Sequence, residues 1–328
     1  MNTYLGVDGG GSKTEFMLID QSGVILARHQ DGPAYYLQIG IDALRAMLAR
    51  GIQATLEQAS LPAARLTYGF VGLPAYGEDS LLLAELDAVA SPTLSGGSYR
   101  CGNDMVCGWA GALACQDGIN MVAGTGSIAY GEFDGRSARG GGWGEVFGDE
   151  GSAYWIAREG LTLFSRMSDG RAPRGPLYDL VREHFGLEHD LDLCAAVNGE
   201  ARGLRSEFAQ LARIVGDAAL RGDVAARELF TRGADELAAI IDATRKRLDV
   251  PNSFVVPVSY SGGMFTLTEL VLKPLQSALD RRGHVYNFVA PRMGPAAGAA
   301  LYAAKCHGTA LSEAAIERIA RRSVPLTA

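Results

Sequence analysis

The chain has 328 residues, of which 48% are hydrophobic and 20% charged, values ordinary for a globular protein with a large buried core. At roughly 100–200 residues per domain, this length predicts two domains. The net charge of −7 argues against a nucleic-acid partner, which requires a basic face. It does not exclude an anionic ligand held by backbone N–H groups and a cation.

Cysteine usage and terminal composition indicate the compartment. The five cysteines are odd in number and no pair has C-x-x-C spacing, which argues against a disulfide framework or a zinc knuckle. The N-terminus shows no secretory signal pattern, and no apolar run is long enough to span a membrane. We therefore expect a cytoplasmic protein with no membrane partner. A homodimer is compatible with the sequence.

The N-terminal region begins with an antiparallel meander. Residues 4–7, 15–19 and 24–28 are strand-like and are joined first by a Gly-rich turn and then by Asp20-Gln21-Ser22-Gly23. Apolar residues at steps of three and four predict a helix over 41–56. The elements predicted next are a strand at 66–73, a helix at 79–90, a strand at 98–102 and a helix at 105–115.

The same pattern then repeats. A strand at 119–123 enters Gly124-Thr125-Gly126-Ser127, and a strand at 128–133 precedes an Asp-Gly turn. This internal duplication predicts an α/β protein with two domains of similar core topology, over residues 1–116 and 117–328. The second domain contains a helical insertion at about 150–248. It continues with a strand at 253–260, a helix at 267–282, a strand at 285–290, a helix from 294 and an amphipathic tail at 309–322.

Two Gly-rich turns are candidate phosphate sites, because glycine lets successive backbone N–H groups form a concavity for phosphate oxygens. The first comprises Gly9, Gly10, Gly11, Ser12, Lys13 and Thr14, and the second comprises Gly124, Thr125 and Gly126. Asp8, at the end of a strand, could hold Mg²⁺ through water. The alternative for the first turn is an ordinary hairpin. For the second it is a dinucleotide-binding fingerprint, although that requires a following helix and residues 128–133 alternate like a strand.

Three further features complete the candidate site. Gly262 and Gly263 follow an apolar strand, where an adenine ring could lie on the backbone; the alternative is a plain turn. Asp104 lies between a strand and a helix. It could act as a general base for an acceptor hydroxyl, or it could be a helix N-cap. Trp143, among glycines, could stack on a sugar ring or anchor a loop in the core, and Asp149 could accept sugar hydroxyls.

These motifs resemble the N-acetylglucosamine kinase branch of the BadF/BadG/BcrA/BcrD-type ATPases, within the sugar kinase, heat-shock 70 and actin superfamily. The likeness runs in order over about residues 4–300. Its most specific part is the Gly-Gly-Trp-Gly…Gly-Asp-Glu-Gly-Ser-Ala block at 141–153. The resemblance implies two ribonuclease-H-like (actin-like ATPase) domains with a central cleft. It also implies transfer of the γ-phosphoryl group of MgATP to the 6-hydroxyl of an N-acetylated amino sugar, N-acetyl-D-glucosamine above all.

The resemblance also implies roles for individual residues. Asp104 takes the position of the catalytic base and sugar ligand, and Ser12 and Thr125 take ATP-phosphate positions. The positions on or beside the sugar are Ser127, Gly142, Trp143, Gly144 and Asp149. The chain departs from the family at Tyr35, which stands where the family carries an Asn that touches the sugar.

Two other functions remain open at this point. An ATPase activator of an electron-transfer enzyme, of the 2-hydroxyacyl-CoA dehydratase or benzoyl-CoA reductase type, would share the phosphate turns. It would also carry cysteines for an iron–sulfur cluster, and their spacing is not apparent here. A non-catalytic sugar sensor would share the sugar block and would bind sugar without producing ADP.

Overall fold

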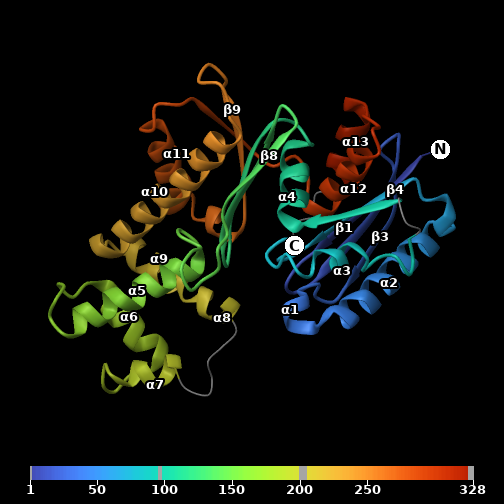
Figure 1. Ribbon diagram of the computed structural model, residues 1–328. Coiled ribbons are helices and arrows are strands. Elements are labelled where there is room, and N and C mark those ends of the chain that lie inside the picture. The colour runs from blue at the N-terminus through green and yellow to red at the C-terminus, as the bar shows by residue number, and fades with distance from the viewer. Residues whose placement is uncertain (1, 95–97, 199–204, 324–328) are drawn as a thin grey trace. The chain divides into compact units, whose positions relative to one another are not determined.

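The computed structural model describes residues 2–94, 98–198 and 205–323 (Figure 1). Within them the chain forms two compact units. The first comprises the residues up to Asn120 and those from Ala290 onward, and the second comprises Met121–Val289. The division falls inside strand β6 (Gly118–Ala123).

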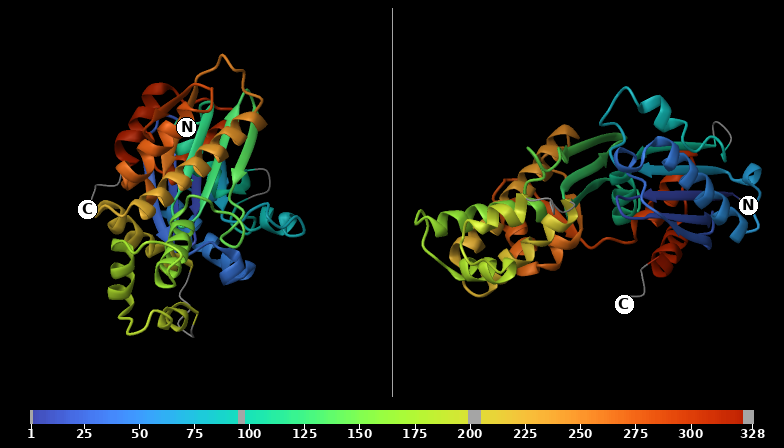
Figure 2. Two further views of the ribbon diagram at one scale, coloured as in Figure 1. Left: turned by 90° about the vertical axis from the view of Figure 1, so that its left-hand side faces the viewer. Right: turned by 90° about the horizontal axis from the view of Figure 1, so that it is seen from below.

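The first unit is a five-stranded sheet of order β3-β2-β1-β4-β5 with helices on both faces (Figure 1, Figure 2). Strands β1, β2 and β3 pair antiparallel, whereas β4 and β5 run parallel to β1. The strands are β1 (Thr3–Gly9), β2 (Thr14–Asp20), β3 (Ile25–Asp31), β4 (Tyr68–Leu73) and β5 (Tyr99–Asn103). The helices are α1 (Tyr36–Ile39), α2 (Ile41–Gln58), the short 3₁₀ turn Ala63–Arg65, α3 (Leu83–Asp87), α4 (Asp104–Leu113), α12 (Pro295–Cys306) and α13 (Glu313–Ser323).

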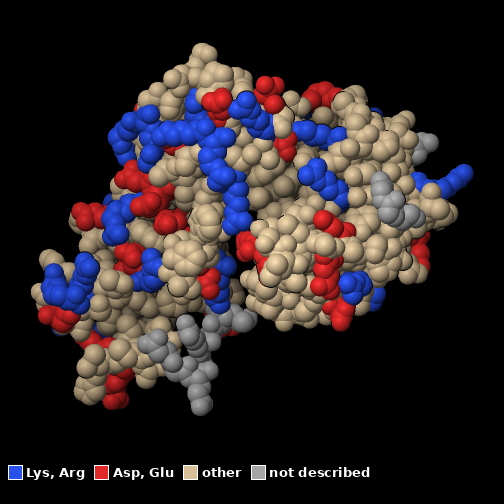
Figure 3. Space-filling model, viewed as in Figure 1, with Lys and Arg blue, Asp and Glu red and all other residues tan. Residues whose placement is uncertain are grey.

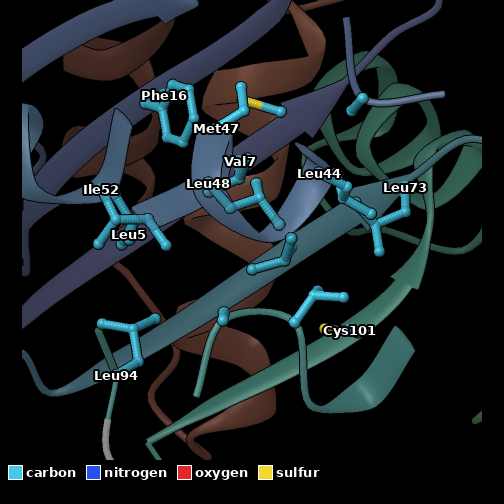
Figure 4. Packing of buried hydrophobic residues seen from close by; sticks show 14 of the residues in the cluster. Leu5, Val7, Phe16, Leu44, Met47, Leu48, Ile52, Leu73, Leu94 and Cys101 are labelled. Carbon is cyan, nitrogen blue, oxygen red and sulfur yellow. The ribbon is translucent and has the colours of Figure 1, made fainter. Parts of the chain in front are cut away.

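The core of this unit lies where α2 meets the sheet. Leu44, Leu48 and Ile52 recur at helical spacing on α2 and are fully buried against Leu5 and Val7 of β1 (Figure 4). Packing of these side chains fixes β1 at the centre of the sheet, so its carboxyl end is held in a defined place.

The C-terminal helices belong to the first unit. The expected division at residue 117 instead placed them in the second domain. Helix α12 packs against α4 and β1, and a Cβ on Gly6 of β1 would lie 2.1 Å from the backbone nitrogen of Ala300. Helix α13 buries Ile316 and Ile319, and Arg318 donates to the carbonyl of Ser22 at 2.7 Å. Glycine and alanine in α12 permit this close packing. Neither periodicity nor composition indicates which of the two sheets α12 packs against.

The second unit repeats the sheet of the first. Its order, β8-β7-β6-β9-β10, matches β3-β2-β1-β4-β5, with β7–β8 antiparallel and β9–β10 parallel. The remaining strands are β7 (Ser127–Phe133), β8 (Arg136–Gly141), β9 (Val256–Ser261) and β10 (Tyr286–Val289). The expected α/β fold and its internal duplication are confirmed.

Helices make up most of the rest of the second unit, as expected for about 150–248. They are α5 (Ala153–Ser168), α6 (Pro176–Phe185), α7 (Asp192–Asn198), α8 (Arg205–Gln210), α9 (Ala212–Leu220), α10 (Val224–Arg247), a 3₁₀ turn Gly263–Thr266, a π-helical turn Thr268–Leu272 and α11 (Lys273–Asp280). Residues 199–204 of the predicted helical region lie outside the described residues.

One predicted helix is shorter than expected. Residues 79–90 form turns around the brief α3, and Leu81 at the start of this segment is exposed. The apolar residues of this segment are therefore only partly buried.

The surface carries charges of both signs, and acidic side chains lie beside basic ones on the face shown in Figure 3. Among the described residues, no helix has the length and apolar character needed to cross a bilayer.

Candidate active site

The first Gly-rich turn joins β1 to β2 and presents backbone to solvent. Gly10 donates its N–H to the carbonyl of Lys13 at 2.9 Å, which closes the turn. Gly11 and Ser12 are exposed, and no described atom would lie within 4 Å of a Cβ on Gly11. An open turn of this kind can receive an anion through its N–H groups.

The other two predicted donors of this turn have structural partners. Thr14 is fully buried, and its hydroxyl donates to the carbonyl of Gly32 at 2.8 Å. The ammonium of Lys13 pairs with Glu15. The Thr14 hydroxyl therefore joins β2 to the segment after β3, and the exposed part of the turn is Gly11-Ser12-Lys13.

Asp8 and Asp104 come together at the carboxyl ends of the parallel strands. Asp8 of β1 is in register with Gly72 of β4, and a Cβ on Gly72 would lie 3.3 Å from the Cα of Asp104. Asn103 is the N-cap of α4, because its side chain accepts from the N–H of Met105 at 3.1 Å. The N-cap alternative for Asp104 is therefore wrong: Asp104 is the first helical residue.

The electrostatics of this strand end suit a cation. Burial, and then the neighbouring carboxylates of Asp104 and Glu15, raise the pKa of Asp8 to about 8. Burial, and then the carboxylates of Asp8 and Asp104, raise the pKa of the Cys107 thiol. The sulfur of Cys107 lies 3.7 Å from the carbonyl oxygen of Val7. A hard cation with oxygen ligands would relieve the repulsion between the carboxylates, so this chemistry fits Mg²⁺.

Tyr35 lies on the loop that contacts the first turn. The N–H of Ala34 donates to the carbonyl of Gly10 at 2.9 Å, and Tyr35 precedes α1 at its N-cap position. The Tyr35 side chain is half-buried against the core of the first unit. The chain at Tyr35 is thus attached to the first Gly-rich turn through its neighbour Ala34.

The second Gly-rich turn joins β6 to β7 in the second unit. The N–H of Gly124 donates to the carbonyl of Gly126 at 2.9 Å, and no described atom would lie within 4 Å of a Cβ on Gly124. Strand β7 follows directly. The dinucleotide fingerprint needs a helix at this place, so that alternative is wrong.

Gly262 lies against this second turn. Its φ of 103° lies in the region that favours glycine, and a Cβ there would lie 2.4 Å from the carbonyl oxygen of Ala123. No described atom would lie within 4 Å of a Cβ on Gly263. The structure therefore brings the predicted adenosine-binding glycines to the end of β6, beside Gly124.

The loop between β8 and α5 exposes Trp143, with 68% of its surface accessible, so the core-anchor alternative for this residue is wrong. Gly142 and Gly144 on either side have φ of 71° and 87°, which other residues rarely adopt. The N–H of Gly148 donates to the carbonyl of Gly144 at 2.9 Å, forming a compact turn after Trp143.

Asp149 is buried behind this loop and bonded to the second turn. Its carboxylate accepts from the N–H of Ser127 at 3.3 Å, while the Ser127 hydroxyl donates to the carbonyl of Glu150 at 2.7 Å. Asp149 adopts a φ of 56°, a conformation in which Asp is tolerated better than most residues. The Ser127 hydroxyl thus has a structural partner, and its N–H orients Asp149.

Arg205 belongs to the same cluster, although sequence patterns did not single it out. Its guanidinium pairs with Asp149, and its Nε lies 3.0 Å from Glu145. Arg205 is the first residue of α8, 56 positions along the chain from Asp149, and no motif surrounds it. Sequence spacing alone could not have found this contact.

Comparison with known proteins gives a family. The chain is 25% identical over 309 residues to the N-acetyl-D-glucosamine kinase of Dictyostelium discoideum, covering 89% of this chain and 96% of that protein. It is 27% identical over 266 residues to the N-acetylmuramic acid/N-acetylglucosamine kinase of Clostridium acetobutylicum, covering 80% and 85%. A solved structure of a candidate N-acetylglucosamine kinase from Chromobacterium violaceum has a TM-score of 0.71 at 29% identity, covering 92% and 98%.

The family assignment rests on a match over most of the chain. Residues 5–303 match the BadF/BadG/BcrA/BcrD ATPase family, which confirms the resemblance of the motifs. This chain therefore belongs to the BadF/BadG/BcrA/BcrD ATPase family.

Proposed function

We propose that this protein is an ATP-dependent kinase that transfers the γ-phosphoryl group of MgATP to the 6-hydroxyl of an N-acetylated amino sugar, N-acetyl-D-glucosamine. The observation that carries the proposal is the bond between Ser127 and Asp149. It joins a phosphate-type turn to the carboxylate behind the exposed Trp143. The names of the relatives described above support the same activity.

The proposed roles follow from the chemistry of each group. The exposed N–H groups of Gly11-Ser12-Lys13 and those of Gly124-Thr125-Gly126 bind phosphate oxygens, and Gly262-Gly263 receives the adenine ring. Trp143 stacks on the sugar ring and Asp149 accepts its hydroxyls. Asp8 would hold Mg²⁺, which when bound would neutralise charge on the triphosphate.

Asp104 is the proposed base. It orients the sugar hydroxyl and accepts its proton as the oxygen attacks the γ-phosphorus. The bond from the γ-phosphorus to the bridging oxygen breaks, and ADP leaves. Phosphoryl transfer needs little covalent help, so orientation and charge are the main contributions of the protein. Tyr35, in place of the family's Asn, is the position where we expect sugar preference to differ.

The test is ADP production from MgATP with N-acetylglucosamine, glucosamine, N-acetylmannosamine, glucose and no sugar. The proposal predicts strong turnover with an acetylated amino sugar and little without one. Equal ADP release with and without sugar would favour the activator-type ATPase, and sugar binding with no ADP would favour a sensor.

A further inference from the structure

Arg205 connects three parts of the second unit. Its guanidinium pairs with the buried Asp149, and its Nε lies 3.0 Å from Glu145 in the loop that carries Trp143. A Cβ on Gly126 would lie 2.6 Å from Arg205 Nη2 and 2.9 Å from Asp149 Oδ2. The absence of a side chain at Gly126 therefore leaves the space in which this ion pair forms.

The position of Arg205 is fixed by packing as well as by charge. Helix α8 lies against α5, with the rings of Phe208 and Tyr154 4.6 Å apart. The N–H of Tyr154 in turn donates to the carbonyl of Thr125 at 3.3 Å. The segment that begins with Arg205 is thus attached to the second phosphate turn by a route independent of the ion pair.

Arg205 counteracts the effect of burial on the charge of Asp149. Only 3% of its side chain is exposed, and burial raises its pKa. Arg205 and the N–H of Ser127 act in the opposite direction, whereas Glu145 adds to the effect of burial. A carboxylate that is ionised and held in one orientation accepts hydroxyl hydrogen bonds more strongly than a protonated carboxyl group.

We propose that Arg205 is a positioning residue that fixes the Asp149 carboxylate against the Gly124–Ser127 turn for binding to sugar hydroxyls. The proposal rests on the sugar kinase function above, because it takes Asp149 as a sugar ligand. The guanidinium acts through Asp149 and makes no contact with the transferred phosphoryl group. With 40% of its side chain exposed, Arg205 can be replaced without leaving an isolated buried charge of its own.

The first test compares Arg205→Gln and Arg205→Lys with wild type in steady-state kinetics, varying sugar and ATP separately. We expect Arg205→Gln to raise the KM for the sugar roughly ten- to hundredfold and to leave the KM for ATP within about twofold. Arg205→Lys should recover part of the loss, since it restores the charge without the planar guanidinium. Arg281→Gln, which removes an exposed arginine paired with Asp235 at 2.7 Å, is the matched control.

Two kinetic results would overturn the proposal. An unchanged sugar KM in Arg205→Gln would show that Asp149 does not depend on Arg205. A rise confined to the KM for ATP would assign Arg205 to the nucleotide phosphates instead.

The second test does not need activity. In protein with ¹³C-labelled aspartate carboxyl groups, the Asp149 signal is identified by its loss in Asp149→Asn and is titrated by NMR. We expect its midpoint to move to higher pH in Arg205→Gln and not in Arg281→Gln. If that shift occurs but no amino sugar is phosphorylated, the proposed function is wrong, while the effect of Arg205 on the Asp149 carboxylate is confirmed. If wild type is an active kinase and the midpoint does not move, the positioning role fails.

Discussion

A Cβ atom on Gly298 of α12 would lie 2.1 Å from the backbone nitrogen of Gly111 on α4, so these two helices pack backbone to backbone. The same atom would lie 2.3 Å from the carbonyl oxygen of Cys107. Real Cβ atoms do not approach backbone this closely, and both helices would have to move apart to accept one. Because Asp104 begins α4, this contact links the C-terminal region to the proposed base.

Gly298→Ala should therefore lower the free energy of unfolding by about 1–3 kcal/mol, the usual cost of overpacking. It should also lower kcat, since a displaced α4 carries Asp104 with it. Urea denaturation and steady-state kinetics measure the two effects. The control is Gly32→Ala, where no described atom would lie within 4 Å of the new Cβ. Wild-type stability in Gly298→Ala would contradict the close packing.

Trp143 should report sugar binding directly by fluorescence. Trp109 and Trp155 are buried, so quenching by acrylamide acts mainly on the exposed Trp143. N-acetylglucosamine should protect this tryptophan from the quencher, because a sugar stacked on the ring excludes it. Trp143→Ala should weaken sugar binding, measured by calorimetry, by about 1–3 kcal/mol without changing thermal stability. Quenching of wild-type Trp143 that saturating N-acetylglucosamine leaves unchanged would place the sugar elsewhere.

Asp242 provides a test of stability against pH away from the site. Burial disfavours its charge, but Lys246 at 2.8 Å, Tyr286 at 2.8 Å and His284 outweigh this, so the pKa of Asp242 lies below its ordinary value of 3.8. A carboxyl group with a lowered folded-state pKa stabilises the protein above its unfolded pKa. The stabilisation is lost as the pH falls through the folded pKa.

Asp242→Asn should accordingly destabilise the protein by about 1–3 kcal/mol at pH 7, with the difference from wild type shrinking below about pH 4. Urea denaturation from pH 7 to about pH 2 measures this difference, because the loss occurs below the unfolded pKa. Asp235→Asn, at the exposed pair with Arg281, should change stability by less than about 1 kcal/mol. A difference at Asp242 that does not vary with pH would show that its charge is not responsible.

Local patterns predicted much of this fold because they depend on neighbouring residues. The repeated strand, Gly-rich turn and strand at 4–19 and 119–133 predicted the duplication, and the spacing of Leu44, Leu48 and Ile52 predicted α2. The placement of α12 on the first unit depends on contacts such as Gly298 with Gly111, which join distant parts of the chain. Sequence periodicity carries no information about such partners.

The candidate site follows the same rule. Motifs selected both Gly-rich turns, Asp104 and the Trp143–Asp149 block as candidates, because glycine runs and strand-end carboxylates are local signals. They did not identify Arg205, whose partner Asp149 is distant in sequence. Nor did they show that the Thr14 hydroxyl donates a hydrogen bond to the carbonyl of Gly32, since the sequence does not distinguish a buried hydroxyl from an exposed one.

Asp104→Asn should retain nucleotide binding and lose turnover by about 10²- to 10⁴-fold, the usual contribution of a general base. Asparagine keeps the shape of the side chain but cannot accept the proton. Calorimetry with ADP and Mg²⁺ measures binding, and ADP release measures turnover. Asp280→Asn, on α11 of the other unit, is the control and should retain wild-type turnover. A fully active Asp104→Asn would remove Asp104 from the role of base.

The most direct test of the central claim is identification of the product by ³¹P and ¹H NMR after incubation of the wild-type protein with MgATP and N-acetylglucosamine. The account predicts N-acetylglucosamine 6-phosphate formed in equal amount to ADP, and none with Asp104→Asn. ADP accompanied by inorganic phosphate, with the sugar unchanged, would contradict it.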